Sequence, residues 1–569
     1  MAHSTRSWAD NFGNIFSSEA QLSSFISPVL RLSILLVLGI SLERVIKSIA
    51  LLPQESYNQP VIFIELIHKL FGSPIQVFGM GLVFLFGVFL VKCYPWLRQR
   101  SRSLFQGWSV FDDAHRLRLW ILSVAAILTW WFTAYDYNLF FNQAHGCDRI
   151  LLLGLFLLIY WRPLFVLPFT VLLAAIIGQL AYPLGGYSWA AQDLLIRSLL
   201  LFAASFCVAA VTGYRKISDL IFITCCLIAA HYLTSGIGKL KLNWLVNNST
   251  HLLLPSAYSN GWWNFLAPAA IIQLTQILSW LNWPMKVLTL VLECGVVFAL
   301  WNKTTFRWFL IGWISLHTGI FLISGICFWH WAVLELIFFL VFFWRKDDFV
   351  RPIFTKRYRV ISWVVILALV IGFQPVALAW IDSPIAYTYQ FEAVGESGQA
   401  YSLSSRFFAP YDYQFILGDF SYLSDQPVLM TFGRAIFKDN LFNDLKQVQS
   451  LADIEGLETE KGRTAFDVDR IDQFDLFCQQ FIGNWNRRLR LRSADASWLS
   501  GVEASSVDKI GAFSAPPLLW IFPRENAFTG QELIARINIY QMLSLYGETH
   551  YQQLRTRKIH TTEISTLRR

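Results

Sequence analysis

Apolar runs of membrane-spanning length recur along the first two thirds of the chain, with short polar segments between them. About 20 apolar residues in a helix cross the roughly 30 Å hydrocarbon core of a bilayer. The runs cover residues 28–52, 74–94, 117–135, 150–160, 164–182, 194–214, 217–235, 265–283, 285–301, 306–326, 328–344 and 360–381. The run at 150–160 is expected to begin earlier, near Asn142, and the run at 328–344 to be partly interfacial. The pattern predicts about nine to twelve membrane segments.

After residue 381 the sequence becomes charged and polar, and residues 382–569 are numerous enough for a separate soluble core. Alternating apolar and polar positions predict strands, and helical spacing predicts helices. The predicted strands are 387–394, 414–422 and 534–546, and the predicted helices are 439–454 and 474–488. The predicted architecture is an α-helical polytopic membrane bundle over residues 28–381, preceded by an amphipathic segment at 1–27 and followed by a strand-rich α+β soluble domain at 382–569.

Composition supports a membrane protein. Of the 569 residues, 55% are hydrophobic and 15% are charged, whereas about a quarter of a soluble protein is charged. The net charge of +8 comes from Lys and Arg in short loops between apolar runs, which is typical of orientation signals rather than of nucleic-acid binding. The basic segment 92–118 is therefore predicted to be cytoplasmic. One run between 265 and 344 is expected not to cross, which places the soluble domain outside.

Cysteines and common motifs exclude several classes of site. Six of the eight cysteines lie in or beside apolar runs, so only Cys147 and Cys478 are candidates for a disulfide. Cysteine and histidine spacing gives no zinc motif, and we predict no metal site. The chain also lacks a P-loop, a dinucleotide-binding glycine motif, a zinc-protease motif and a nucleophile elbow.

Ionisable residues inside apolar runs cost about 2.5–3.5 kcal/mol each on insertion scales, so each one needs a reason. We expect Arg31, Glu43 and Arg44 to pair with other helices or to reach headgroups. His251 and His330 are weaker candidates for function, because both are expected at the aromatic belt of the membrane interface.

The segment from His231 to Trp244 is the main candidate site. An apolar run ends in Gly236 and Gly238, and Lys239 follows at the expected membrane surface. Glycines let the chain turn sharply and allow backbone or ligand to approach closely. Apolar surroundings disfavour the charged form of an amine, which makes Lys239 a candidate general base. The structural alternative is a lysine that anchors a helix end by reaching toward the headgroups.

This segment resembles a motif of vitamin K-dependent gamma-glutamyl carboxylases and of the related bacterial HTTM membrane proteins. In that motif a Tyr precedes Ser or Ala, then Gly-x-x-Lys-Leu, then Trp. The matching residues here are Gly236-Ile237-Gly238-Lys239-Leu240 followed by Asn243-Trp244-Leu245. The resemblance extends over about residues 28–344 and implies a bacterial inner-membrane protein with an extracytoplasmic C-terminal domain.

Two further matches follow the same family order. Glu293 in one helix, basic Arg307 in a short loop and His317 in the next helix form the second match. The third is Asn142 with His145, where the family often has an adjacent Asn-His pair; the two residues are not adjacent here.

The resemblance implies a reduced quinone as cofactor, bound between helices among Trp and Phe side chains. It implies that Lys239 deprotonates the quinol, with His317, Glu293 and His145 as further catalytic residues. The expected cofactor-binding residues are Gly236, Gly238, Trp244 and His231. We expect His317 and Glu293 to contact the quinone oxygens or each other, and His231 to share the face of Lys239. The structural alternatives are a polar clasp between two helices for Glu293 and His317, and packing for His231.

Two functions follow from these observations. The first is a quinol-dependent, carboxylase-like lyase that acts on an exported peptide or small substrate at the outer face. The alternative is a non-catalytic membrane subunit or scaffold whose polar residues serve helix packing. A transporter is less favoured, because the sequence has neither evident inverted repeats nor paired broken helices. The lipid bilayer is the one partner that both functions require.

Overall fold

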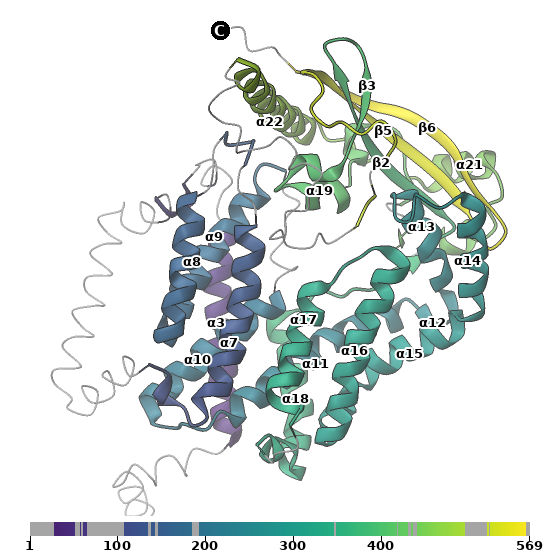
Figure 1. The fold of residues 1–569 in the computed structure, drawn as a ribbon. Helices are drawn as coiled ribbons and strands as arrows, with labels where there is room; N and C mark the ends of the chain where they lie inside the picture. Colours follow the sequence, from purple (N-terminus) through teal and green to yellow (C-terminus); the bar gives the residue numbers. More distant parts are fainter. Residues whose placement is uncertain are drawn as a thin grey trace, which may run out of the picture.

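The computed structural model (Figure 1) describes residues 28–51, 57, 61–64, 66, 107–134, 138–142, 146–184, 193–345, 349–417, 419–430, 434–435, 441–494, 520–522 and 524–564. Its helices form a membrane body, and a smaller domain containing a sheet lies across one end of that body. The predicted segments 1–27 and 74–94 lie outside the described residues. A mostly helical body followed by a strand-containing C-terminal part confirms the coarse architecture predicted from the sequence.

The helices of the body follow the predicted apolar runs closely. The helical elements up to residue 241 are α3 (Pro28–Ala50), η2 (Gly107–Val110), α7 (Ala114–Thr133), α8 (Gly146–Trp161), η3 (Pro163–Phe165), α9 (Val166–Ala181), α10 (Asp193–Thr212) and α11 (Ser218–Lys241). Those that follow are α12 (Trp244–Asn247), η5 (Thr250–Leu252), α13 (Leu253–Ser259), α14 (Pro268–Trp280), α15 (Asn282–Cys294), η6 (Gly295–Trp301), α16 (Lys303–Ser324), α17 (Trp329–Phe338), η7 (Phe339–Phe343), η8 (Arg351–Phe354) and α18 (Lys356–Phe373).

Five helical segments among the described residues are long and apolar enough to cross a membrane, which indicates an integral membrane protein. They are Pro163–Ala181, Asp193–Thr212, Ser218–Lys241, Asn282–Trp301 and Lys303–Ser324. Helix α14 has only 13 residues, about 20 Å at 1.5 Å per residue, and is too short to cross. It and the short apolar helix Trp329–Phe343 are therefore the candidates for the run between 265 and 344 that was expected not to cross.

Helix α11 is the central helix of the body. In its apolar stretch 89% of the residues are buried inside the protein, against 22% in α16. It contacts α3, α10, α15 and α18 (Figure 1). Polar side chains on α11 are consequently shielded from lipid by neighbouring helices, whereas much of α16 faces outward.

The ends of α16 are encoded by the local sequence. The side chain of Asn302 accepts a hydrogen bond from the backbone N–H of Thr305, as a helix N-cap does. The helix ends at Gly325, whose φ of 69° is the left-handed conformation that glycine adopts without a steric penalty. These two signals fix the length of the helix that carries His317.

The C-terminal domain is built on an antiparallel sheet with the order β3-β2-β5-β6. Its strands are β2 (Ile385–Gly395), β3 (Ala400–Leu403), β5 (Ile534–Tyr546) and β6 (Tyr551–Glu563), and β1 (Ile381–Asp382) pairs separately with β4 (Arg434–Ala435). The predicted strands at 387–394 and 534–546 are confirmed. Its helical elements are η9 (Ser405–Phe408), α19 (Asp412–Leu417), η10 (Ser421–Leu423), α20 (Leu441–Leu445), α21 (Leu451–Lys461) and α22 (Val468–Ala494).

Two predicted elements of this domain were wrong in part. Residues 414–417 lie in α19 and residues 421–422 in η10 instead of a strand, and Tyr411 and Phe415 are buried at a helical spacing of four residues. Residues 439–454 contain a helix break, because Ser450 and Asp453 form a capping box that begins α21. The predicted helix at 474–488 is confirmed within α22.

Helix α22 packs a row of aromatic side chains against the sheet. Phe474, Phe477 and Phe481 are fully buried in the same core as Phe391 of β2. Cys478 is buried in this core, whereas Cys147 is exposed at the start of α8, and both are free thiols. The candidate disulfide between these cysteines is therefore not formed: one side chain is enclosed by phenylalanines and the other faces outward.

A loop of the membrane body anchors this domain. Phe140, between α7 and α8, stacks on Phe477 with ring centroids 5.6 Å apart. Asn138 donates from Nδ2 to the hydroxyl of Tyr411 at 3.1 Å, and Asn484 donates from Nδ2 to the backbone oxygen of Leu139 at 2.8 Å. The loop is thus part of the core of the C-terminal domain, which fixes that domain on the end of the helices.

Candidate functional site

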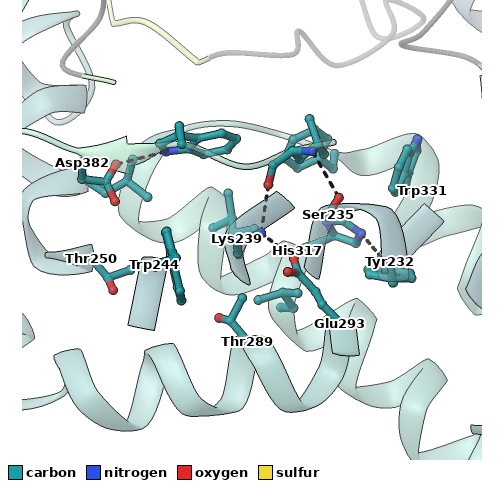
Figure 2. Close-up of a pocket in the computed structure, with 16 residues that line it drawn as sticks. Tyr232, Ser235, Lys239, Trp244, Thr250, Thr289, Glu293, His317, Trp331 and Asp382 are labelled. Carbon is teal, nitrogen blue, oxygen red and sulfur yellow. Dashed lines mark hydrogen bonds and ion pairs between the residues drawn. The ribbon is translucent and has the colours of Figure 1, made fainter. Parts of the chain in front are cut away.

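A cavity of about 80 Å³ lies where the end of α11 meets α15, α16 and the extended segment 374–380 (Figure 2). The residues that line it are Tyr232, Ser235, Lys239, Trp244, Thr250, Leu253, Thr289, Glu293, Leu316, His317, Ile320, Phe328, Trp331, Leu378, Trp380 and Asp382. Four residues predicted at the site are among them: Lys239, Trp244, Glu293 and His317. The cavity therefore joins two segments that are far apart in the sequence and that both carry the family resemblance.

Lys239 is 8% exposed and lines the cavity. Its Nζ donates to Glu293 Oε1 at 2.7 Å and to the backbone oxygen of Leu378 at 2.9 Å (Figure 2). Nζ also lies 5.7 Å from the centre of the Trp244 ring, within the range of a cation–π contact. The amine is therefore an ion-pair partner of Glu293 inside the protein, and it does not reach toward headgroups.

The Lys239–Glu293 pair can hold its protons in two ways. One form is an ammonium beside a carboxylate, and the other is an amine beside a carboxylic acid. The two forms differ only by a proton shift along the 2.7 Å hydrogen bond. Among the described residues, Glu293 Oε2 has no hydrogen-bond partner. The pair consequently keeps one acceptor available to a ligand.

Gly236 and Gly238 lie inside α11, which continues to Lys241. The expectation that they turn the chain was therefore wrong. A Cβ on Gly236 would lie 2.7 Å from Cys294 Sγ and 3.1 Å from Glu293 Cβ, and one on Gly238 would lie 2.8 Å from Ala379 Cβ. The glycines thus allow α15 and the segment 374–380 to approach α11, which brings Glu293 within reach of Lys239.

Tyr232 joins His317 to a carboxylate that the sequence analysis did not identify. Its hydroxyl lies 2.7 Å from His317 Nε2 and donates to Oε1 of Glu335. Its ring stacks on Trp313, with centroids 4.3 Å apart and planes 6° apart. Glu293 and His317, which were expected to contact each other or the quinone oxygens, are thus bonded to different partners, Lys239 and Tyr232.

Hydrogen bonds hold the extended segment over the cavity. The backbone N–H of Asp382 donates to Asn248 Oδ1 at 2.7 Å, and Trp380 donates from Nε1 to Asp382 Oδ1 at 3.1 Å. The backbone N–H of Leu378 donates to Ser235 Oγ at 3.2 Å. The segment that leads into the C-terminal domain therefore forms one wall of the site.

Several buried polar atoms of the lining have no hydrogen-bond partner among the described residues: Thr250 Oγ1, Glu293 Oε2, His317 Nδ1 and Trp331 Nε1. Most buried polar groups in proteins are paired, so each exception needs an explanation. The indole N–H can only donate, an ionised carboxylate can only accept, and the hydroxyl and imidazole can do either. The lining thus suits a small ligand group that both donates and accepts hydrogen bonds.

A second buried polar cluster lies about two turns of α11 away from Lys239. Arg197 of α10 donates to Glu43 Oε1 at 2.8 Å, to Asp193 Oδ2 at 2.6 Å and to the backbone oxygen of Phe373 at 2.5 Å. These bonds tie α3, α10 and α18 together around a guanidinium that is 2% exposed. Glu43 pairs with another helix, as the sequence predicted.

His231 belongs to this second cluster. Its Nε2 lies 3.1 Å from a guanidinium nitrogen of Arg197, and its Nδ1 lies 2.9 Å from the backbone oxygen of Leu227. The expectation that His231 shares the face of Lys239 was wrong, because eight residues at about 100° each leave the two side chains about 80° apart. His231 does not line the cavity.

Other predicted residues lie elsewhere. His145 is outside the described residues. His330 is buried against Trp131, with ring centroids 4.6 Å apart, and does not line the cavity. Arg31 pairs with Asp219 at 2.8 Å, which confirms that it meets another helix, whereas Arg44 is exposed.

Sequence reasoning missed Tyr232 and Glu335, although both carried a signal. Tyr232 occupies the tyrosine position of the family motif, three residues before Ser235. Glu335 is the one carboxylate in the apolar run 328–344, and an isolated charge in such a run marks a functional candidate.

The described residues contain no group of three or more His, Cys, Asp or Glu side chains that could hold a metal ion. Comparisons of the chain with protein families, with curated proteins and with solved structures give no match.

Proposed function

We propose that this chain is an HTTM-like membrane enzyme whose Lys239–Glu293 pair takes a proton from a substrate in the cavity. The observation that carries the proposal is a buried ion pair that lines a cavity and leaves Glu293 Oε2 without a partner among the described residues. Structural ion pairs usually satisfy all of their polar atoms, whereas a proton acceptor needs a free one. The family resemblance adds a quinol as the proton donor and a carboxylase-like overall reaction.

The lining residues fit the polar edge of a quinol. Glu293 Oε2 and His317 Nδ1 are the acceptors that would meet hydroxyl groups, and Phe328 and Trp331 supply apolar surface. When bound, the quinol would supply an acidic hydroxyl and reducing equivalents. The cavity of about 80 Å³ is below the roughly 300 Å³ typical of small-molecule pockets, so a bicyclic ring requires its walls to move.

The test uses the full chain in lipid nanodiscs with menadiol as the quinol and dioxygen as the oxidant. We expect Lys239→Met to lower protein-dependent menadiol consumption by about 100-fold or more, the usual range for loss of an acid–base group. Glu293→Gln should have a similar effect, because the pair acts as one unit. Lys241→Met is the matched control, since Lys241 is exposed at the end of the same helix.

Thermal unfolding of each variant shows whether it is folded. A folded Lys239→Met protein that consumes menadiol at the wild-type rate would contradict the proposal. The alternative function, a scaffold without catalysis, predicts that neither wild type nor variant consumes menadiol and that the protein purifies with a stable partner. The Arg197 cluster, whose buried polar atoms all have hydrogen-bond partners, supports a purely structural role for the helices around it. It does not explain why polar atoms of the cavity lining have no partner among the described residues.

We further propose that the body makes about nine to twelve crossings of a bacterial inner membrane and that the C-terminal domain faces the exterior. The lengths of α3 (23 residues), α7 (20 residues) and α18 (18 residues) support more crossings than the five most apolar segments. On this orientation, a peptide or small substrate reaches the cavity from the outer face. A reporter enzyme that is active only outside the cytoplasm, fused after residue 569, should be active.

A further inference from the structure

We propose that Glu335 stores a proton and that Tyr232 passes it to His317, which delivers it to the cavity that the Lys239–Glu293 pair also lines. This inference rests on the proposed function and adds the second half of its acid–base chemistry. The three groups come from separate helices, with Tyr232 on α11, His317 on α16 and Glu335 on α17. They form a continuous hydrogen-bonded chain that ends at a cavity wall.

Glu335 differs from the other buried carboxylates of the described membrane body, each of which has a cation or, for Asp148, the backbone N–H groups of Ile62 and Phe63 as partners. Arg197 pairs with Glu43 and Asp193, Arg31 pairs with Asp219, and Lys239 pairs with Glu293. Glu335 is 0% exposed, and no basic side chain among the described residues forms an ion pair with it. An ionised carboxylate without a cation is very costly in an apolar interior, whereas the neutral acid is not. Glu335 is thus suited to hold a proton at rest.

The hydrogen-bonded relay of Glu335, Tyr232 and His317 has two complete arrangements of its hydrogen bonds. In the first, the Glu335 carboxyl donates to the Tyr232 oxygen, the Tyr232 hydroxyl donates to His317 Nε2, and His317 carries its proton on Nδ1. In the second, His317 Nε2–H donates to the Tyr232 oxygen, the Tyr232 hydroxyl donates to the Glu335 carboxylate, and Nδ1 is a bare acceptor. Each arrangement uses every shared atom once, as tyrosine, imidazole and carboxyl groups allow.

Passage from the first arrangement to the second releases one proton. The Nδ1–H proton goes to the acceptor in the cavity, the tyrosine proton goes to Nε2, and the glutamic acid proton goes to the tyrosine oxygen. Only O–H and N–H bonds change, and no electron moves between groups. His317 Nδ1 is the end from which the proton leaves, and it has no partner among the described residues. After product release, the reverse passage with a proton from solvent in the cavity restores the first arrangement.

Aromatic rings hold the relay in place. Trp313 stacks on Tyr232, and Trp313 Nε1 donates to the backbone oxygen of Leu292 at 3.0 Å. Trp331 meets His317 edge-on, with centroids 5.8 Å apart, and Tyr232 at 6.3 Å. Tyr232, His317 and Glu335 are all at most 5% exposed. The rings keep the hydroxyl between its two partners, so that the proton passes along the chain and not to bulk water.

The site then has a base and an acid that line the same cavity. The Lys239–Glu293 pair accepts a proton, and the Glu335–Tyr232–His317 chain gives one back. Enzymes commonly separate these roles by giving two titratable groups different surroundings. Here the difference is a neighbouring cation, which Glu293 has and Glu335 lacks. His317 touches the substrate in this scheme, whereas Tyr232 and Glu335 act through it.

The test compares Glu335→Gln, Tyr232→Phe and their double variant in the menadiol assay. Glutamine keeps the shape and a hydrogen bond but cannot release a proton. We expect each single variant to lower the turnover rate about 100-fold, with the double variant no slower, because serial members of one chain are not additive. Trp fluorescence quenching by menadione should show unchanged binding. A buried control on the same helix is His330→Gln, which should keep the wild-type rate.

Deuterium oxide distinguishes a relay from a structural role. The wild-type rate should depend non-linearly on the deuterium fraction, because several protons move together, and the dependence should become linear in both single variants. One contrary result is a folded Glu335→Gln protein that keeps both the wild-type turnover rate and the non-linear dependence on deuterium fraction while Lys239→Met loses activity. That result would overturn the relay and leave the proposed function intact. Activity retained in Lys239→Met as well would remove both. If Glu335→Gln does not fold, Tyr232→Phe gives the same information.

Discussion

Two polar clusters meet the central helix α11 at the adjacent residues His231 and Tyr232, and they differ in how completely their atoms are paired. The arginine cluster consists of Glu43, Asp193, Arg197 and His231, and the cavity cluster consists of Tyr232, Lys239, Glu293, His317 and Glu335. Both are buried inside the helical body. Within the described residues, every buried polar side-chain atom of the arginine cluster has a partner, whereas Glu293, His317 and Glu335 of the cavity cluster each have one buried atom without a partner.

This difference is the basis for proposing a structural role for the arginine cluster and a functional role for the cavity cluster. A fully bonded charge cluster can hold helices in register, and moving any member leaves an uncompensated charge. Buried acceptors without a partner are unfavourable, and a ligand in the adjacent cavity can supply the missing hydrogen bonds. Burial of charged residues alone therefore does not identify the site. The proposed site is distinguished by polar atoms without a partner among the described residues and by the cavity beside them.

The largest expected effect on stability is that of Arg197→Met. The substitution leaves Glu43 and Asp193 buried without their cation, and loss of one partner from a buried ion pair costs about 3–5 kcal/mol. Thermal unfolding of the detergent-solubilised protein measures the loss. Arg44→Met is the matched control, because Arg44 is exposed one residue after Glu43, and it should unfold as the wild type does.

Replacing the cation of the cavity cluster by methionine should lower the free energy of unfolding by less. Lys239→Met leaves Glu293 beside a cavity that can admit water, so we expect a loss of about 1–3 kcal/mol, the usual cost of an unsatisfied group. Equal losses for Arg197→Met and Lys239→Met would show that pairing does not distinguish the two clusters.

The next largest effect is expected from Gly236→Ala. The added Cβ would meet Cys294 Sγ at 2.7 Å and the backbone carbon of Glu293 at 3.1 Å, so α11 and α15 must move apart. Overpacking of this kind costs about 1–3 kcal/mol and would also lengthen the Lys239–Glu293 hydrogen bond. Unfolding temperature and menadiol consumption should therefore fall together.

Gly319→Ala provides the control for the helix itself. A Cβ on Gly319 meets no atom within 4 Å, so alanine should stabilise α16 by about 0.5–1 kcal/mol. A Gly236→Ala protein that is as stable and as active as Gly319→Ala would show that close approach of α11 and α15 is not needed by the cavity cluster.

The sequence predicted the helices better than the contacts between them. Apolar periodicity is a local property, so α10 was placed within two residues of its observed ends and the start of α11 within one, whereas α11 continues to Lys241, six residues beyond its predicted end. The membership of Lys239, Glu293 and His317 in one site came from a family resemblance, and the cavity is consistent with it. The resemblance itself stays a prediction.

Contacts that depend on side-chain direction could not be predicted. Whether His231 or Tyr232 faces His317 depends on a rotation of 100° about α11, which the sequence of a helix buried on all sides does not specify. The choice of Arg197 as the partner of Glu43 depends on how α3 packs against α10, and many arginines were available. The place of Glu335 beside Tyr232 could not be predicted for the same reason, because it depends on how α17 packs against α11.

The smallest expected effect is on the pH dependence of stability and concerns His251, which follows Thr250 of the cavity wall. This buried imidazole belongs to neither cluster. Burial lowers the pKa of His251 below its usual value of about 6.5, and the nearby charge of Lys286 adds to this lowering. Glu548, whose Oε1 lies 3.4 Å from His251 Nε2, and the side chain of Asn282 raise the pKa but do not outweigh burial. Because the folded protein prefers the neutral ring, His251 contributes stability that is present above about pH 6.5 and is lost as pH falls below it toward the lowered pKa of the folded state. The unfolding temperature of the wild type should therefore fall more between about pH 7.5 and pH 5.5 than that of His251→Gln. Identical pH dependence in the two proteins would show that this ring is not held neutral by the fold.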